Sequence, residues 1–295
     1  MRWIDTHCHL DAPEFGTTIQ AQRALAASNG VVHCVIPAIA VDNFEAVRTL
    51  AHQNGDSYCL GITPMNVPYA TEDALSRLTA EVQQHRADPS LVAIGEIGLD
   101  YFLPELCKSP WRERQHEFFY AQLKLARAYD LPVVVHSRRA VDQILKALRE
   151  VAGPGGQWHG VVHAFNGSFQ QALAFIQLGF KLGFGGAVTY ERARQLRSLA
   201  TGLPLEAIVL ETDSPDMPPR WLYKSAEQRA AGEPQGINSP AEVPRIGAEL
   251  AELRGISPQA LAAATTHNAL QAFPRLRALT EPTTPDVTQN EKNTP

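Results

Sequence analysis

Two histidines separated by a single residue, His7 and His9, lie close to the start of the chain. In a strand, successive side chains alternate between the two faces, so we expect both imidazoles to point the same way. Two imidazoles side by side at the carboxyl end of a buried strand form half of a tetrahedral or octahedral metal site. A His-X-His pair by itself is also common by chance, because His is a frequent surface residue. The pair therefore indicates a metal site only if further ligands come from later in the chain.

Further candidate ligands follow later apolar runs. Glu96 lies between glycines after the fourth run, His136 and His163 follow the fifth and sixth, and Asp213 follows the eighth. Four imidazoles and two carboxylates are too many for one structural zinc and suit two divalent ions bridged by a carboxylate. We expect Glu96 to be the bridge, and Asp213 to bind the first ion and act as general base toward a water. The chemistry that this set indicates is hydrolysis by a metal-activated water, with Zn²⁺, Mg²⁺ or Mn²⁺ as the metal.

The elements that position these residues alternate between short apolar runs and amphipathic stretches of helical length. This alternation is typical of repeated βα units and a parallel sheet. Eight strands, each followed by a helix, predict a single-domain (β/α)8 TIM barrel over residues 1–279, with the six candidate ligands at the carboxyl rim where such barrels carry their active sites. The predicted strands are Ile4–His7, Val31–Ile36, Ser57–Gly61, Leu91–Ile94, Leu131–Val135, Gly160–Val162, Phe180–Phe184 and Ala207–Leu210. Residues 280–295 are rich in Thr, Pro and Asn without apolar periodicity, and we expect a disordered tail there.

Composition restricts the possible partners. The chain of 295 residues has a net charge of −5, and its only adjacent basic pair is Arg138-Arg139. A protein that coats nucleic acid along its length needs a basic face, so any phosphate recognition must be local, at a strand end or on a short single-stranded piece. No apolar run is long enough to span a membrane, and the first strand leaves no room for a signal peptide. We expect a cytoplasmic monomer whose four cysteines are reduced core thiols.

Taken together, the motifs resemble those of the TatD family of metal-dependent deoxyribonucleases, among the amidohydrolase-like barrels. The matching stretches are residues 5–11, 95–100, 136–138, 163–168 and 211–215, and the resemblance covers the chain from residue 3 to about 273. It implies a two-metal hydrolase with the ligand set named above, and some members of the family remove nucleotides from DNA 3′ ends. The resemblance therefore predicts a 3′–5′ exodeoxyribonuclease acting on DNA ends or short single strands.

Two stretches depart from the family pattern. Thr63 and Met65 stand where family members commonly carry histidines after the third strand, and Ser239 follows Asn238 where a charged residue is usual. We expect metal binding to survive both changes, whereas the effect on phosphodiester cleavage is open. Three residues are predicted to contact substrate. Arg138 could clamp a phosphate in a bidentate manner, Tyr101 could stack on a base, and Asn238 belongs to the family's motif.

Two other functions stay open at this point. A barrel with the same ligands and different loops could hydrolyse a small phosphoester, amide or lactone, and the acidic net charge slightly favours that alternative. The second open function is that of an interaction protein that binds metal without catalytic activity. The intact set of six ligands argues against it, because an idle site has no physical need for an open two-metal arrangement.

Overall fold

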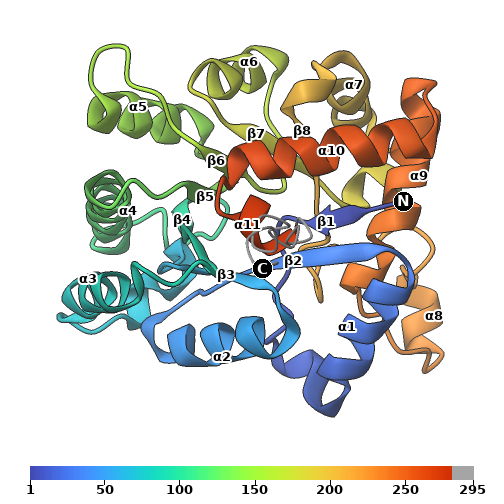
Figure 1. Ribbon diagram of the computed structural model, residues 1–295, viewed down its shortest axis with the longest axis horizontal. Coiled ribbons are helices and arrows are strands. Elements are labelled where there is room, and N and C mark those ends of the chain that lie inside the picture. Colours follow the sequence, from blue (N-terminus) through green and yellow to red (C-terminus); the bar gives the residue numbers. More distant parts are fainter. Residues whose placement is uncertain (281–295) are drawn as a thin grey trace, which may run out of the picture.

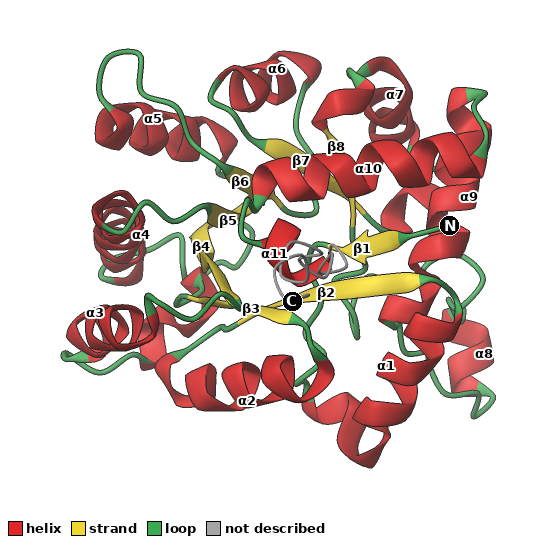
Figure 2. Cartoon of the chain, viewed as in Figure 1, coloured by secondary structure: helices red, strands yellow, loops and turns green. Residues whose placement is uncertain are grey.

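The computed structural model describes residues 1–280, and in them eight strands form one sheet in the order of the sequence. Each neighbouring pair is parallel. The strands lie in a ring with the helices outside it (Figure 2), which confirms the predicted (β/α)8 barrel. The strands are β1 Trp3–Asp5, β2 Val31–Pro37, β3 Ser57–Leu60, β4 Leu91–Asp100, β5 Val133–Arg138, β6 Gly160–Val162, β7 Lys181–Phe184 and β8 Ile208–Leu210.

From α1 to α7 the helices follow one another around the outside of this ring in chain order (Figure 1). Their apolar faces pack on the strands, as in α5, whose buried Val141, Ile144 and Leu148 follow the helical repeat. The helices are α1 Ile19–Ser28, α2 Phe44–Asn54, α3 Ala74–His85, α4 Trp111–Ala128, α5 Val141–Ala152, α6 Phe169–Gln177, α7 Arg194–Gly202, α8 Ala226–Ala230, α9 Val243–Arg254, α10 Pro258–Ala272 and α11 Leu276–Thr280. Short 3-10 turns are η1 Pro13–Thr18, η2 Val41–Asn43, η3 Pro64–Tyr69, η4 Gly186–Thr189, η5 Leu205–Ala207 and η6 Pro240–Glu242.

The first and last strands meet through backbone hydrogen bonds just beyond their ends. Thr6 N donates to Leu210 O at 3.0 Å, and Asp213 N donates to His7 O at 2.9 Å. His9 N donates to Ser214 O at 2.8 Å. These bonds hold the segment after β1 against the segment after β8, so that two stretches some two hundred residues apart in sequence form one side of the rim.

Two strand boundaries differ from the sequence-based prediction. The strand predicted to end at His7 ends at Asp5. Beyond it the chain makes single backbone bonds to both neighbours, from Cys8 N to Val35 O of β2 and between His7 and the loop after β8. The strand predicted to end at Ile94 runs on to Asp100. Its pairing with β5 shifts register between Ile94 and Ile97, and Glu96 lies within this irregular stretch. A local irregularity of this kind re-aims side chains, and here it lies beside the predicted site.

The amino end of the barrel is closed by the segment that leads from α10 into α11. Phe273 and Leu276 are fully buried and pack with Ile4, Val134 and Val209 of the strands in one apolar cluster. Figure 1 shows α11 in front of the ring of strands. This closure leaves the carboxyl end as the open one. The predicted tail, residues 280–295, lies outside the described residues apart from Thr280, which ends α11.

A buried ion pair stands at the amino ends of β2 and β3. Arg23 of α1 donates from Nε to Asp56 Oδ2 at 2.7 Å and from Nη2 to Oδ1 at 3.0 Å. Asp56 is fully buried, and its Oδ1 also accepts from Cys34 N at 2.9 Å. Arg23 Nη1 donates to Val31 O at 3.3 Å. Both charges are therefore matched by protein groups within hydrogen-bond distance.

The cysteines are free thiols, and Cys8, Cys34 and Cys59 are buried in the core as predicted. Within residues 1–280, no helix combines the length and the apolar character needed to cross a membrane.

Candidate active site

Six side chains from five strands converge at the carboxyl rim. In the first group, His7 Nε2 and His9 Nε2 lie 3.2 Å apart. Asp213 Oδ1 lies 3.4 Å from His7 Nε2 and 3.7 Å from His9 Nε2. Glu96 Oε2 lies 3.7 Å from each of these two nitrogens. The ligand atoms of His7, His9 and Asp213 thus all lie within 4.8 Å of one another, with Glu96 Oε2 beside the two imidazoles.

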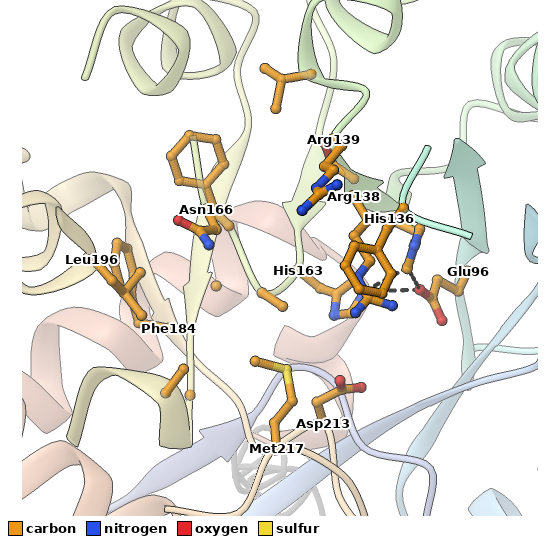
Figure 3. A pocket seen from close by; sticks show the side chains of 18 of the residues that line it. Glu96, His136, Arg138, Arg139, His163, Asn166, Phe184, Leu196, Asp213 and Met217 are labelled. Carbon is orange, nitrogen blue, oxygen red and sulfur yellow. Dashed lines mark hydrogen bonds and ion pairs between the residues drawn. The ribbon is translucent and has the colours of Figure 1, made fainter. Parts of the chain in front are cut away.

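The second group of side chains, His136 and His163, contacts the other carboxylate oxygen of Glu96. Glu96 Oε1 is 2.8 Å from His136 Nδ1 and 2.8 Å from His163 Nε2. The two imidazole nitrogens lie 3.4 Å apart. Figure 3 shows His136 and His163 turned toward Glu96, with Asp213 nearby. Glu96 therefore presents one oxygen to each group, which is the arrangement expected of a bridging ligand.

The spacing of the first group fits a cation. Ligands held roughly 2.1 Å from a tetrahedral metal are about 3.4 Å apart, and the distances among His7, His9 and Asp213 lie between 3.2 and 3.7 Å. Most of the nitrogen–oxygen separations are too long for good direct hydrogen bonds. Three-ligand clusters suited to a metal are formed by His7, His9 and Asp213 and by His7, Glu96 and His163. The donor set of imidazoles and carboxylates suits Zn²⁺ and also harder ions such as Mn²⁺.

Electrostatics in the site follow from crowding at low solvent exposure. Burial raises the pKa of Glu96, but the neighbouring His163 and His136 outweigh it and hold the pKa well below its ordinary value. Burial and the charge on His163 lower the pKa of His7 well below its usual range. Burial also raises the pKa of Asp213. Burial lowers the pKa of His163 and His136, but the Glu96 carboxylate beside both and Asp100 beside His136 outweigh it, raising the pKa of His163 to about 10 and that of His136 above its ordinary value. A cation that binds these two imidazoles would take the place of their protons.

Asp100 positions His136, and the sequence analysis did not single out this role. Its Oδ2 lies 3.1 Å from His136 Nε2, while Oδ1 accepts from Phe102 N at 2.8 Å. A carboxylate on the far nitrogen fixes the ring orientation of a metal-binding histidine. Asp100 ends the same strand four residues after Glu96, and this even spacing in an apolar run is the signal that could have revealed the role.

Asp5 was also missed, and it ties the start of the site to its end. This fully buried carboxylate accepts from Thr212 N at 3.0 Å and from Thr212 Oγ1 at 2.6 Å. It also accepts from His7 N at 3.2 Å. Burial raises its pKa to about 7. The contacts fix the backbone on both sides of the pair formed by His7 and Asp213.

Glu211 is a third carboxylate that the analysis of the sequence did not assign. Its Oε1 accepts from Ala164 N, next to His163, and burial raises its pKa to about 8. Gly183 of β7 makes room for it, since a Cβ there would lie 2.1 Å from Glu211 Oε2. Glu211 therefore supports the backbone beside His163 from below the rim.

A cavity of about 1000 Å³ is lined by five of the six candidate ligands, and the sixth, His7, is fully buried behind them. One wall carries Arg138, Arg139 and Phe102, with the Arg138 guanidinium carbon 3.6 Å and that of Arg139 4.8 Å from the centre of the Phe102 ring. Within the described residues, no carboxylate oxygen lies within 4.0 Å of a guanidinium nitrogen of Arg138 or Arg139. Arg138 is thus placed beside the ligands as predicted, and its contact with substrate stays a prediction.

Tyr101 does not line this cavity, and here the structure corrects the prediction. Its hydroxyl is hydrogen-bonded to His116 Nε2, and the Arg112 guanidinium lies over its ring at 5.4 Å. The next residue, Phe102, faces the cavity instead. The reason is the sharp turn after β4, where Asp100 accepts from Phe102 N and Leu103 N.

The prediction that Asn238 contacts substrate is also corrected, because the residue is fully buried. Its Nδ2 donates to Thr212 O at 2.8 Å, Asp216 O at 2.9 Å and Met217 O at 3.3 Å. Its Oδ1 accepts from Ser239 N at 3.0 Å. Asn238 therefore holds the loop that carries Asp213 and acts on the site through that loop.

The stretch after β3 divides between the core and the cavity. Thr63 is fully buried, and its Oγ1 accepts from Asn66 Nδ2 at 2.9 Å. Met65 lines the cavity. Of the two positions where the family commonly has histidine, only Met65 faces the site, so a methionine thioether stands where an imidazole is usual.

Eight parallel strands with imidazole and carboxylate ligands at the carboxyl rim define a metal-dependent hydrolase barrel. The chain belongs to the TatD family, since the family model described as TatD related DNase matches residues 4–274. A metal-dependent hydrolase of Escherichia coli called YjjV, uncharacterized, is 39% identical over 273 residues, which are 92% of this chain and 98% of that protein. The human deoxyribonuclease TATDN3 is 31% identical, covering 94% of this chain and 96% of its own.

Solved structures agree with this assignment. The crystal structure of YjjV, a TatD homolog, superposes with a TM-score of 0.80 at 38% identity and covers 92% of this chain and 98% of its own. An uncharacterized amidohydrolase from Saccharomyces cerevisiae superposes with a TM-score of 0.75 at 17% identity, over 92% of this chain and 100% of its own. The latter likeness shows the fold alone, which is amidohydrolase-like. The protein is therefore a metal-dependent hydrolase of the TatD family.

Proposed function

We propose that this hydrolase is a two-metal deoxyribonuclease that releases nucleotides one at a time from the 3′ end of single-stranded DNA. The observation that carries the proposal is that the two oxygens of Glu96 face different ligands: Oε2 faces His7 and His9, and Oε1 faces His136 and His163. Two ions about 3.5–4 Å apart are the usual means by which phosphodiesters are cleaved by in-line displacement.

The chain's own residues then have distinct tasks. When bound, the ions supply Lewis-acid chemistry to a phosphoryl oxygen and make water a better nucleophile. Asp213 accepts the proton of the attacking water, and burial has moved its pKa upward toward that of a useful base. The water oxygen bonds to phosphorus, the bond from phosphorus to O3′ of the preceding nucleotide breaks, and O3′ leaves with the electron pair and takes up a proton from solvent. The products are a 5′-mononucleotide and a shortened strand with a 3′-hydroxyl.

The wall of Arg138, Arg139 and Phe102 supports a phosphate-bearing substrate. A guanidinium binds a phosphate through two parallel hydrogen bonds, and the Phe102 ring holds that of Arg138 in place at 3.6 Å. This recognition is local, in keeping with a net charge of −5 for the whole chain. The human relative named a deoxyribonuclease supports the same substrate class.

The test is cleavage of a 5′-labelled single-stranded oligonucleotide by the purified protein in Mg²⁺, Mn²⁺ or Zn²⁺. We expect a ladder that shortens by one nucleotide at a time from the 3′ end. Arg138→Gln should raise KM for this strand about tenfold or more, because a charge-assisted hydrogen bond is lost. Arg149→Gln, an exposed change on α5, is the matched control and should leave KM as in the parent.

Hydrolysis of a lactone, an amide or a small phosphoester without cleavage of the oligonucleotide would contradict the proposal. It would favour the second candidate, a hydrolase of small esters using the same ligands. The apolar side of the cavity, formed by Phe184, Leu196 and Met217, is the feature that would accept such a substrate.

A further inference from the structure

A second cavity lies beside the one over the ligands. Its volume is about 490 Å³, within the range of ligand-binding pockets of roughly 300–1000 Å³. Ala187, Asp216 and Met217 line both cavities. The two hollows therefore meet over Met217, and a ligand long enough to cross this residue can occupy both.

The boundary between the cavities is built into the fold. Gly186 lies directly beneath it, since a Cβ at that position would stand 2.3 Å from Met217 O. Asn238 donates to the same carbonyl at 3.3 Å. Tyr190 donates from its hydroxyl to Pro218 O at 2.8 Å. The ridge at Met217 is thus tied on one side to the loop of Asp213 and on the other to the wall of the second cavity.

The second cavity is aromatic and cationic. Its Tyr190 and Tyr223 rings stand edge to face with centroids 6.0 Å apart. The Arg192 guanidinium carbon lies 5.2 Å from the Tyr190 centroid and 5.8 Å from that of Tyr223. Tyr223 is 40% exposed, so a ligand can reach its ring. Arg229 completes this cationic side.

Neither guanidinium is neutralised by the protein. Among residues 1–280, no carboxylate oxygen lies within 4.0 Å of the nitrogens of Arg192 or Arg229. Asp216 is the one acidic residue that lines the cavity. A ligand that combines a flat aromatic ring with a negative charge fits this surface, because the ring can stack on tyrosine and the charge can pair with arginine. An acyl chain would leave both cations without a partner.

We propose that Tyr190, Tyr223, Arg192 and Arg229 form a subsite for the nucleotide that precedes the scissile phosphate of a single strand. This inference rests on the proposed function and extends it to the substrate's second nucleotide. The terminal nucleotide lies in the larger cavity along the Arg138 wall, and the strand leaves across Met217 toward solvent. Figure 3 shows Arg138 and Arg139 on one side of His163, with Met217 and Asp213 on the other.

The experiment compares kcat/KM for a deoxythymidine trinucleotide with kcat/KM for bis(4-nitrophenyl) phosphate, which is too short to reach the subsite. In Tyr223→Ala the ratio of the two should fall about tenfold, the lower part of the range for base–aromatic stacking. Tyr223→Phe keeps the ring and should restore the ratio. Tyr69→Ala is the matched control, since Tyr69 is 84% exposed and lines neither cavity; its ratio should stay within about twofold of the parent.

A trinucleotide that lacks the base 5′ to the scissile phosphate completes the design. For the parent, kcat/KM should fall with this abasic strand by about the same factor as it falls with the intact strand in Tyr223→Ala. The variant should have the same kcat/KM for both strands. Binding of a fluorescent trinucleotide in EDTA, followed by anisotropy, measures the same contacts without hydrolysis. Its Kd should rise about tenfold in Tyr223→Ala.

The outcomes separate the two proposals. If the parent cleaves the trinucleotide but the ratio is the same in Tyr223→Ala, the subsite is wrong and the nuclease function stands. If the parent does not cleave DNA but binds the strand through Tyr223, the subsite stands and the proposed reaction is wrong. If Tyr223→Ala changes neither cleavage nor binding, the inference is overturned.

Discussion

The two ends of the barrel each bury a cluster of charge, and the clusters differ in how the charge is matched. At the amino end, Arg23 and Asp56 make two hydrogen bonds of 2.7 and 3.0 Å with each other. At the carboxyl rim, Glu96 and Asp213 share their surroundings with four imidazoles. The oxygens of this rim cluster that face His7 and His9 stand 3.4–3.7 Å from the nitrogens.

The difference separates a structural cluster from a functional one. A buried carboxylate with a close guanidinium needs no further charge, so the amino-end pair is complete without a ligand. At the rim, His136 and His163 lie 2.8 Å from Glu96 Oε1, whereas the oxygens that face His7 and His9 stand 3.4–3.7 Å from those nitrogens. The rim therefore has the donor atoms and the spacing to hold cations from solution, whereas the carboxylate at the amino end is already paired within the chain.

The largest effect should follow from Glu96→Gln, which keeps the size of the side chain and removes its charge. Both ligand groups lose an oxygen anion together, so we expect fewer than two metals per chain and a loss of hydrolysis of more than about a thousandfold. His163→Ala should chiefly empty the second group, because the first keeps His7, His9 and Asp213. For both variants, elemental analysis gives the number of metal ions per chain, and an activity assay gives the rate of hydrolysis.

Glu105→Gln is the control for this change, being exposed and outside both cavities. It should match the parent in metal content and rate. Two tightly held ions in Glu96→Gln, with near-parent rates, would show that this carboxylate does not bridge.

A smaller effect, on stability alone, is expected from Arg23→Met. The change leaves Asp56 buried without its cation, which should lower the free energy of unfolding by about 3 kcal/mol. Urea unfolding measures it. Arg48→Met removes an exposed pair with Glu45 and should cost less than about 1 kcal/mol.

Metal content and hydrolysis of folded Arg23→Met should equal those of the parent, since Arg23 lies at the other end of the barrel from the ligands. A loss of bound metal in this variant would mean that the two clusters are coupled, and the contrast between them would fail.

The smallest effect should come from Asn238→Ala, which removes three hydrogen bonds to the loop of Asp213 without touching a ligand. We expect metal affinity and kcat to fall about tenfold, as for groups that orient metal ligands. Titration with Zn²⁺ or Mn²⁺ and steady-state rates measure this change. If KM for DNA rises while metal affinity and kcat are unchanged, Asn238 acts on substrate after all.

Much of the rim could be predicted from the sequence because strand ends are visible in it. His136 follows a run of valines, and His163 follows Val161 and Val162. The carboxyl ends of parallel strands lie at the same rim of the barrel, so residues at these ends come close together regardless of the loop conformations. The lengths of β1 and β4 were not predictable in the same way, because each depends on pairing with a strand or loop far away in sequence.

Side-chain direction beyond the strands was harder to predict. Tyr101 and Phe102 are adjacent aromatic residues, and the turn held by Asp100 decides that Phe102 faces the cavity. Asn238 reaches back to Thr212 across 26 positions, a contact that no local pattern encodes. The second cavity likewise joins η4 to the loop after β8.

The sequence by itself determined the alternation of strands and helices, and with it the barrel and the identity of the six residues on its rim. Periodicity and strand ends are local properties, and chain geometry carries them into space with little freedom. Only the tertiary structure decided which oxygen of Glu96 faces which imidazoles, that Asp100 holds His136, and that Met217 joins two cavities. Those features depend on distances of a few ångströms between segments that the sequence separates, and packing of the whole barrel sets them.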